Sequence, residues 1–177
     1  MSCIFALCSG VSLFFVSYSE ASFFRSILFI LAAVFIQCRL LCNLFDGMVA
    51  VEGGLKSNSG EIYNDFPDRI SDFFILVGAG YSIFLYNWAP VLGWIAATMA
   101  ILTAYVRVLG VSTGAKQHFE GPMAKQHRMA IMTFACILSI FIPKGYCITV
   151  ALLLIILGSF ITVIRRLYNV VKELESK

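Results

Sequence analysis

Charged residues are scarce in this chain of 177 residues: only 13% are Asp, Glu, Lys or Arg, whereas 60% are hydrophobic and the mean hydropathy is +0.89. Soluble domains carry about 25% charged and roughly 45–50% apolar residues, so an ordinary soluble domain is excluded. Basic runs are also missing, which argues against a nucleic-acid partner. The six cysteines are scattered, mostly inside apolar runs, and are typical of small buried side chains rather than zinc ligands.

Continuous apolar segments occupy most of the chain. Each has roughly 15–21 residues, and a helix needs about 20 to cross the hydrocarbon core of a bilayer. Alternation with period two is absent, so strands are not expected. We therefore predict an all-α polytopic membrane protein, a single domain over residues 1–177 with six transmembrane helices. The expected spans lie at about residues 3–18, 26–45, 70–87, 89–109, 128–142 and 146–164.

The positions of lysine and arginine predict the orientation of these spans. The connection between the fourth and fifth spans carries Lys116, Lys125 and Arg128, and that between the second and third carries Lys56 and Arg69. The tail after the sixth span is basic as well, whereas the third and fourth spans are joined without any basic residue. Because basic loops stay on the cytoplasmic side, we place these connections and both chain ends there. We expect an integral protein of a bacterial cytoplasmic (inner) membrane.

Polar residues gather between the second and third spans. Ionisable residues beside a bilayer are unfavourable and usually serve function. If residues 60–72 form a helix, spacings of three and four place its acidic and amide side chains on one face. This face comprises Glu61, Asn64, Asp65, Asp68 and Asp72.

The end of the second span presents a matching polar face. Arg39, Asn43 and Asp46 follow one another at spacings of four and three. If the two faces oppose each other, Asn43, Asp46, Asn64 and Asp68 surround a common point. Ligands that are all oxygen suit hard divalent ions such as Mg²⁺ or Ca²⁺ rather than zinc. The sequence therefore predicts a divalent-cation site at the cytoplasmic end of these helices.

The same residues resemble the CDP-alcohol phosphotransferase family, whose pattern is D-x2-D-G-x2-A-R-x8-G-x3-D-x3-D. Asp46, Gly47, Ala50, Gly60 and Asp68 stand at the family's spacing without insertion or deletion. The later stretches AYVRVLG and GPMAKQHRM are similar to the family's fourth and fifth helices. The resemblance covers nearly the whole chain and implies a six-helix membrane fold with the site at its cytoplasmic end.

Three positions depart from the family pattern. Asn43 and Asn64 replace its first and third aspartates, and Val51 replaces its arginine. Asparagine offers a carbonyl oxygen but no negative charge. The resemblance implies that Mg²⁺ or Mn²⁺ is held by Asn43, Asp46, Asn64 and Asp68. These four positions carry two negative charges here instead of the family's four, so the site is expected to hold either one or two ions.

The resemblance also implies roles for individual residues. The metal ions would bridge Asp46 and Asp68 to the pyrophosphate of a CDP-linked donor, and Asp68 would be the catalytic base. Gly47, Ala50 and Gly60 would lie against the nucleotide. A second set of residues, Arg107, Lys125 and Arg128, could bind an acceptor phosphate or a lipid headgroup, although for Lys125 and Arg128 a role as positively charged anchors is equally favoured.

The function implied is phospholipid biosynthesis. A substituted phosphate would be transferred to an alcohol with release of CMP. The favoured group is phosphatidyl, with CDP-diacylglycerol as its donor. The alternative donor is a CDP-linked small alcohol. Two alternatives stay open: a catalytically weakened homologue that binds CDP-lipid or metal as a partner subunit, and a small cation transporter. The Gly78, Ala79 and Gly80 run predicts a close helix contact. The family resemblance implies a homodimer.

Overall fold

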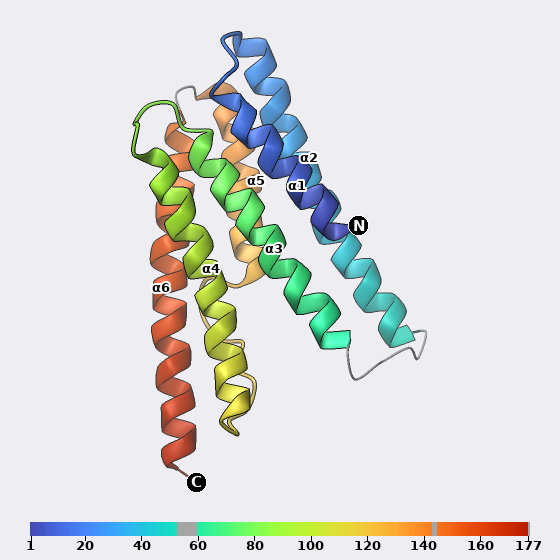
Figure 1. The fold of residues 1–177 in the computed structure, drawn as a ribbon, viewed down its shortest axis with the longest axis vertical. Helices are drawn as coiled ribbons and strands as arrows, with labels where there is room; N and C mark the ends of the chain where they lie inside the picture. The colour runs from blue at the N-terminus through green and yellow to red at the C-terminus, as the bar shows by residue number, and fades with distance from the viewer. Residues whose placement is uncertain (53–59, 143–144, 177) are drawn as a thin grey trace.

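The regular secondary structure of the described residues is entirely helical. The computed structural model describes residues 1–52, 60–142 and 145–176, without the side chains of residues 50–52, 61 and 64. These residues form α1 (Ser2–Val16), α2 (Ser22–Glu52), α3 (Gly60–Tyr81), α4 (Ala89–Ser112), α5 (Lys125–Phe141) and α6 (Tyr146–Glu175), shown in Figure 1. The predicted all-α class with six helices is therefore confirmed.

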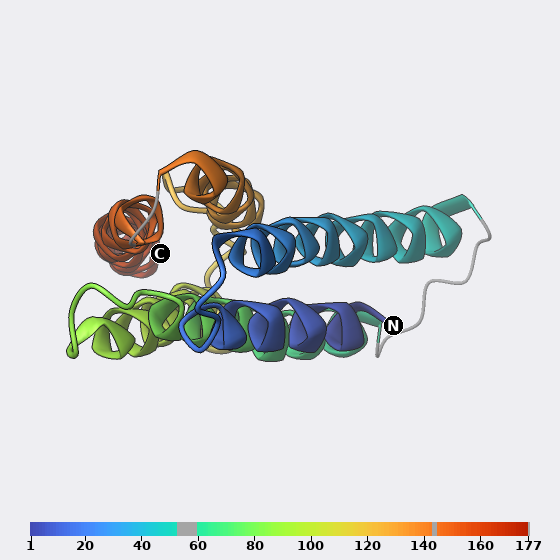
Figure 2. The ribbon, with the colours of Figure 1, turned by 90° about the horizontal axis from the view of Figure 1, so that it is seen from above.

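The helices lie in two layers. Seen from above, α4, α3 and α1 stand side by side in one layer, and α6, α5 and α2 in the other (Figure 2). Neighbours pack within each layer, and α1 with α2 and α4 with α6 close the two edges. The middle helices α3 and α5 thus face each other across the interior, where the polar residues described below meet.

Close packing within the first layer depends on glycine. A Cβ atom on Gly78 would lie 2.4 Å from the backbone oxygen of Gly10, and one on Gly80 would lie 2.9 Å from the Cα atom of Gly93. Small residues let helix backbones approach each other in this way. The close contact predicted for the Gly78–Gly80 run is confirmed, and within the chain it joins α3 to both α1 and α4.

The helix ends differ from the predicted spans where the sequence is polar. α2 continues beyond residue 45 to Glu52, and α3 begins at Gly60, so the motif lies on helices. The third span was predicted to reach residue 87, but α3 ends at Tyr81 and a turn leads to α4. That turn contains aromatic residues, which hydropathy alone does not separate from a helix.

The surface of the bundle is consistent with a bilayer. Three segments are long and apolar enough to cross one, namely Ser22–Val49, Ala89–Ser112 and Tyr146–Glu175, and α1 is a shorter apolar helix. Large apolar side chains such as Phe134, Leu157 and Phe160 face outward. Fully buried arginine and aspartate side chains lie inside, which inverts the arrangement of a soluble bundle.

Candidate functional site

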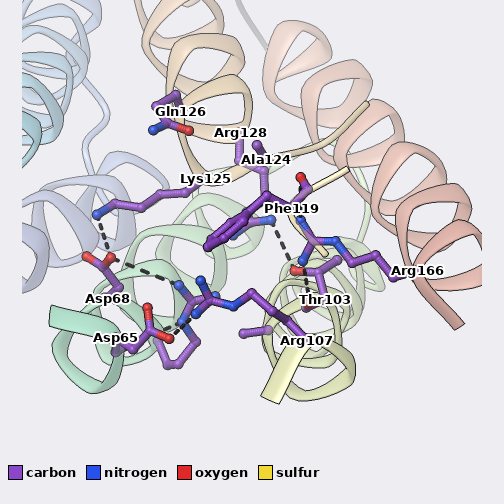
Figure 3. A pocket seen from close by; sticks show the side chains of 12 residues that line it. Asp65, Asp68, Thr103, Arg107, Phe119, Ala124, Lys125, Gln126, Arg128 and Arg166 are labelled. Carbon is purple, nitrogen blue, oxygen red and sulfur yellow. Dashed lines mark hydrogen bonds and ion pairs between the residues drawn. The ribbon is translucent and has the colours of Figure 1, made fainter. Parts of the chain in front are cut away.

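A polar cavity of about 410 Å³ opens at the end of the bundle where α2 ends and α3 and α5 begin. Its walls come from α3, α4, the segment before α5, α5 and α6 (Figure 3). The lining residues are Asp65, Asp68, Arg69, Thr103, Ala104, Arg107, Phe119, Ala124, Lys125, Gln126, Arg128 and Arg166. Five cationic side chains therefore surround two carboxylates, and the cavity carries a net positive charge.

Asp68 lies at the centre of the contacts in this cavity. The Lys125 ammonium lies 2.5 Å from its Oδ2 atom, and the Asn43 side-chain amide donates to its Oδ1 atom at 2.7 Å. Arg39 reaches the same Oδ1 atom at 3.4 Å. Residues from α2 and α5 thus converge on one carboxylate of α3, which is held in a fixed orientation by its donors.

A second carboxylate lies one helical turn farther into the bundle. Asp72 is fully buried, and its two oxygens accept hydrogen bonds from Arg39 at 2.8 Å and from Arg128 at 2.7 Å. Arg128 also donates to the Thr103 hydroxyl at 3.3 Å and to the Met123 carbonyl at 3.0 Å. These pairs satisfy charges that would otherwise be very unfavourable in the interior.

The outer part of the cavity is organised around Arg107. Its guanidinium pairs with Asp65 and lies 5.0 Å from the centre of the Phe119 ring, in cation–π contact. Arg166 fixes the segment that carries Phe119, since it donates to the carbonyls of Phe119 at 3.1 Å and Glu120 at 2.9 Å. The segment before α5 is thereby held over the cavity.

Burial changes the acid–base behaviour of Lys125. Desolvation disfavours its ammonium form and lowers its pKa from the ordinary lysine value, although the hydrogen bond and the charge of Asp68 act in the opposite direction. An ammonium group that is held in this way can lose its proton at a lower pH than a lysine on the surface.

The structure brings some of the predicted site residues together. Asn43, Asp68 and Lys125 are in direct contact, and Arg107 lies in the same cavity. Asp46 lies one turn beyond Asn43 with an exposed side chain, and no hydrogen bond or ion pair joins it to Asp68 between described residues.

The remaining predicted positions are less informative. Gly47 has open space around the position that a Cβ atom would take, and Gly60 is the first residue of α3. A ligand could therefore approach the backbone at Gly47 closely. The side chains of Ala50 and Asn64 lie outside the described part of the chain.

Sequence reasoning placed Arg39, Asp65 and Asp72 on the two polar faces without naming them as site residues, and it did not point to Phe119 or Arg166. A signal existed for three of them: Asp65 and Asp72 share the face of Asp68, and Arg39 shares that of Asn43. Arg166 was placed in a basic tail beyond the last span. Its spacing from the motif carries no information, because its contacts depend on how α6 packs.

The motif positions supply oxygen donors of the kind that a divalent ion binds. Among the described side chains, no group of three or more His, Cys, Asp or Glu is placed to hold a metal ion. Two carboxylates at the motif positions, Asp46 and Asp68, and the carbonyl oxygen of Asn43 are ligands of the kind Mg²⁺ and Mn²⁺ prefer. The ammonium of Lys125 already occupies a cation position on Asp68, so the carboxylate does attract positive charge.

Comparison with known proteins identifies related sequences and structures. A family model described as CDP-alcohol phosphatidyltransferase matches residues 1–166. A search of curated proteins finds no significant match.

Three solved structures of phosphatidylinositol phosphate synthase (PgsA1) from Mycobacterium tuberculosis share the fold. The one with CDP-DAG bound has 17% identity and a TM-score of 0.71, and the alignment covers 96% of this chain and 86% of that one. The complex with manganese and citrate has 19% identity, a TM-score of 0.71 and coverage of 96% and 82%. The apo form has 20% identity, a TM-score of 0.68 and coverage of 96% and 88%.

Proposed function

The chain belongs to the CDP-alcohol phosphatidyltransferase family, and we propose that it transfers phosphatidyl from CDP-diacylglycerol to an alcohol that carries an anionic group. The observation that carries this proposal is the excess of cationic side chains around Asp68. Arg69, Arg107, Lys125, Arg128 and Arg166 line one cavity with two aspartates. Arginine and lysine clusters of this kind bind phosphate groups.

The proposed chemistry joins the acceptor oxygen to the phosphorus that bears the diacylglycerol. The bond from that phosphorus to the CMP oxygen breaks, and the acceptor hydroxyl proton passes to the Asp68 carboxylate. In the structure Asp68 Oδ2 is paired with Lys125, so this oxygen must first be released. We infer that the anionic group of the acceptor draws Lys125 away from Asp68, which would free the base only when acceptor is present.

A divalent ion, Mg²⁺ or Mn²⁺, would be held by Asp46 and Asp68 with the carbonyl of Asn43. When bound, it supplies positive charge that neutralises the phosphates as CMP leaves. Asn43 and Lys125 keep the Asp68 carboxylate turned toward the cavity. The relative solved with manganese and citrate supports a metal requirement.

An apolar groove supports a lipid donor over a CDP-linked small alcohol. It has a volume of about 340 Å³ and lies between α2 and α5, the two helices that bring Asn43 and Lys125 to Asp68. Its lining residues are Ile30, Ala33, Val34, Gln37, Cys38, Thr133 and Ile137. Acyl chains in this groove would place the donor headgroup toward the cavity, and the PgsA1 structure with CDP-DAG bound supports such a donor.

We further propose that the cavity faces the cytoplasm. The cavity lies at the end of the bundle that carries the segment between α4 and α5 and the basic end of α6, as the positive-inside rule requires. The homodimer remains a prediction.

CMP release tests the proposed function. Purified protein in lipid nanodiscs with Mn²⁺ and CDP-diacylglycerol is supplied with glycerol, serine and inositol, and with the phosphates of glycerol and inositol. We expect CMP release with a phosphorylated acceptor and its loss in Asp68→Asn, whereas Glu20→Gln, an exposed residue far from the cavity, retains activity. Equal behaviour of wild type and Asp68→Asn would refute the enzyme, and a response to neutral alcohols alone would refute the anionic acceptor.

A second candidate function rests on the replaced aspartates. With Asn43 donating to Asp68, the chain could bind CDP-lipid as a partner subunit without turnover. Calorimetry would then show CDP-diacylglycerol binding with no CMP release for any acceptor. Family membership offers no support for the cation-transporter alternative.

A further inference from the structure

Asp72 is a fully buried carboxylate that takes no direct part in the proposed transfer. It lies one turn after Asp68 on α3, and each of its oxygens pairs with a different arginine, Arg39 on one side and Arg128 on the other. Burying three charges together is unfavourable unless each is paired and hydrogen-bonded. Their position directly behind Asp68 points to a role at the cavity.

The three residues come from different helices. α3 packs mainly against α1 and α4, whereas α2 and α5 pack against each other in the opposite layer. Arg39 from α2 and Arg128 from α5 therefore reach across the interior to a carboxylate on α3. The pairing fixes both arginines relative to the helix that carries Asp68.

The two arginines are anchored to different degrees. Arg128 also donates to Thr103 and to the Met123 carbonyl, so part of its position is independent of Asp72. The Nε and Nη1 atoms of Arg39 have no hydrogen-bond partner among the described residues. Only its Nη2 atom is engaged, at 2.8 Å from Asp72, 3.4 Å from the Asp68 carboxylate and 3.3 Å from the Asp68 carbonyl.

Arg39 is thus shared unequally between two carboxylates. The shorter contact is with Asp72, and the contact with Asp68 is long for a charged hydrogen bond. If the charge of Asp72 were absent, Asp68 would be the remaining carboxylate within reach of Arg39.

We propose that Asp72 is a positioning residue for the transfer: it keeps the Arg39 guanidinium closer to itself than to Asp68, so that Arg39 makes only a long contact with the Asp68 carboxylate and competes weakly with a divalent cation and the acceptor hydroxyl for it. This inference rests on the proposed function. Asp72 itself touches neither substrate nor metal, and acts through Arg39.

Manganese binding without substrate tests the inference. Free Mn²⁺ is measured by electron paramagnetic resonance in titrations of wild type, Asp72→Asn, Arg39→Gln and the double variant R39Q/D72N. Asparagine keeps the size of Asp72 and removes its charge, so Arg39 competes with the ion for Asp68. We expect the dissociation constant to rise about tenfold in Asp72→Asn and to return to within about threefold of wild type in the double variant.

The controls separate positioning from folding. Thermal unfolding and gel filtration establish that each variant is folded, Glu20→Gln is the charge-matched control, and Asp68→Asn should lose the site. A purely structural role for Asp72 predicts that Mn²⁺ affinity is lost only as the variant unfolds, whereas competition by Arg39 predicts weaker binding at temperatures at which Asp72→Asn is fully folded.

Three outcomes would overturn the inference. The first is an unchanged dissociation constant in folded Asp72→Asn, and the second is a double variant as weak as Asp72→Asn. If Asp72→Asn does not fold, the Arg39→Gln variant tests the inference instead. Removing Arg39 relieves Asp68 of a competing charge, so Arg39→Gln should bind Mn²⁺ at least as tightly as wild type. Weaker binding by Arg39→Gln is the third outcome that would overturn the inference. If wild type itself binds no Mn²⁺ and releases no CMP, the proposed function fails instead.

Discussion

The Lys125 ammonium lies 2.5 Å from Oδ2 of Asp68, on the carboxylate that occupies the last aspartate position of the family motif. The same lysine lines the cavity with four arginines. It therefore stands between the proposed base and the proposed binding place of the acceptor anion. Several consequences for pH, substrate binding and metal binding can be measured.

The first prediction concerns pH. Burial lowers the pKa of Lys125, so as the pH rises the folded protein loses this positive charge earlier than an exposed lysine would. Acceptor binding then weakens, and kcat/KM for the acceptor should fall on the alkaline side. Because arginine stays protonated, Lys125→Arg should move this alkaline limb to higher pH.

The measurement is a pH profile of kcat/KM for the phosphorylated acceptor. Lys172→Arg, an exposed lysine near the end of α6, serves as the control and should leave the limb in place. Coincident profiles for wild type and Lys125→Arg would show that Lys125 does not carry the titration.

The second prediction concerns Phe119, whose ring lies over the Arg107 guanidinium. An exposed cation–π contact contributes about 0.5–1 kcal/mol, so Phe119→Leu should raise the acceptor KM about two- to fivefold with little change in kcat. Phe160→Leu on the outer face of α6 is the matched control. A drop in kcat at constant KM would mean that Phe119 acts on the chemical step instead.

Sequence reasoning succeeded where the signal is local. Apolar length predicted six helices, and spacings of three and four placed Asn43 and Asp68 on polar faces that do meet. The partners of Asp68 and Asp72 were harder to predict. For Arg128 the sequence favours a membrane anchor and a phosphate-binding residue equally, yet its side chain is buried against Asp72. Such pairings depend on how α3 and α5 face each other across the two layers, which no spacing within one helix encodes.

The third prediction concerns the packing of α1 on α3. A Cβ atom on Gly78 would lie 2.4 Å from the Gly10 oxygen, so Gly78→Ala forces the helices apart and should destabilise the protein by about 1–3 kcal/mol. The matched control is Gly47→Ala, at a position where an added Cβ atom would meet open space. Replacing a glycine inside a helix by alanine favours the helix by about 1 kcal/mol. Thermal unfolding in one detergent compares the two. Equal melting temperatures would contradict the close contact.

The last prediction concerns Asn43, which stands where the family has an aspartate. Its amide donates to Asp68 Oδ1 at 2.7 Å, so Asn43→Asp replaces a hydrogen bond by two like charges in contact. Without metal this variant should be less stable than wild type. A divalent ion between the two carboxylates would reverse the repulsion, so Mn²⁺ should raise the melting temperature of Asn43→Asp by more than it raises that of wild type.

Asn43→Ser separates the two effects, because it also removes the amide donor but adds no charge. It should lose stability without gaining a larger response to Mn²⁺. If Asn43→Asp is stabilised by Mn²⁺ no more than Asn43→Ser, the carboxylate at this position does not reach the ion. The assignment of Asn43 as a metal ligand would then fail.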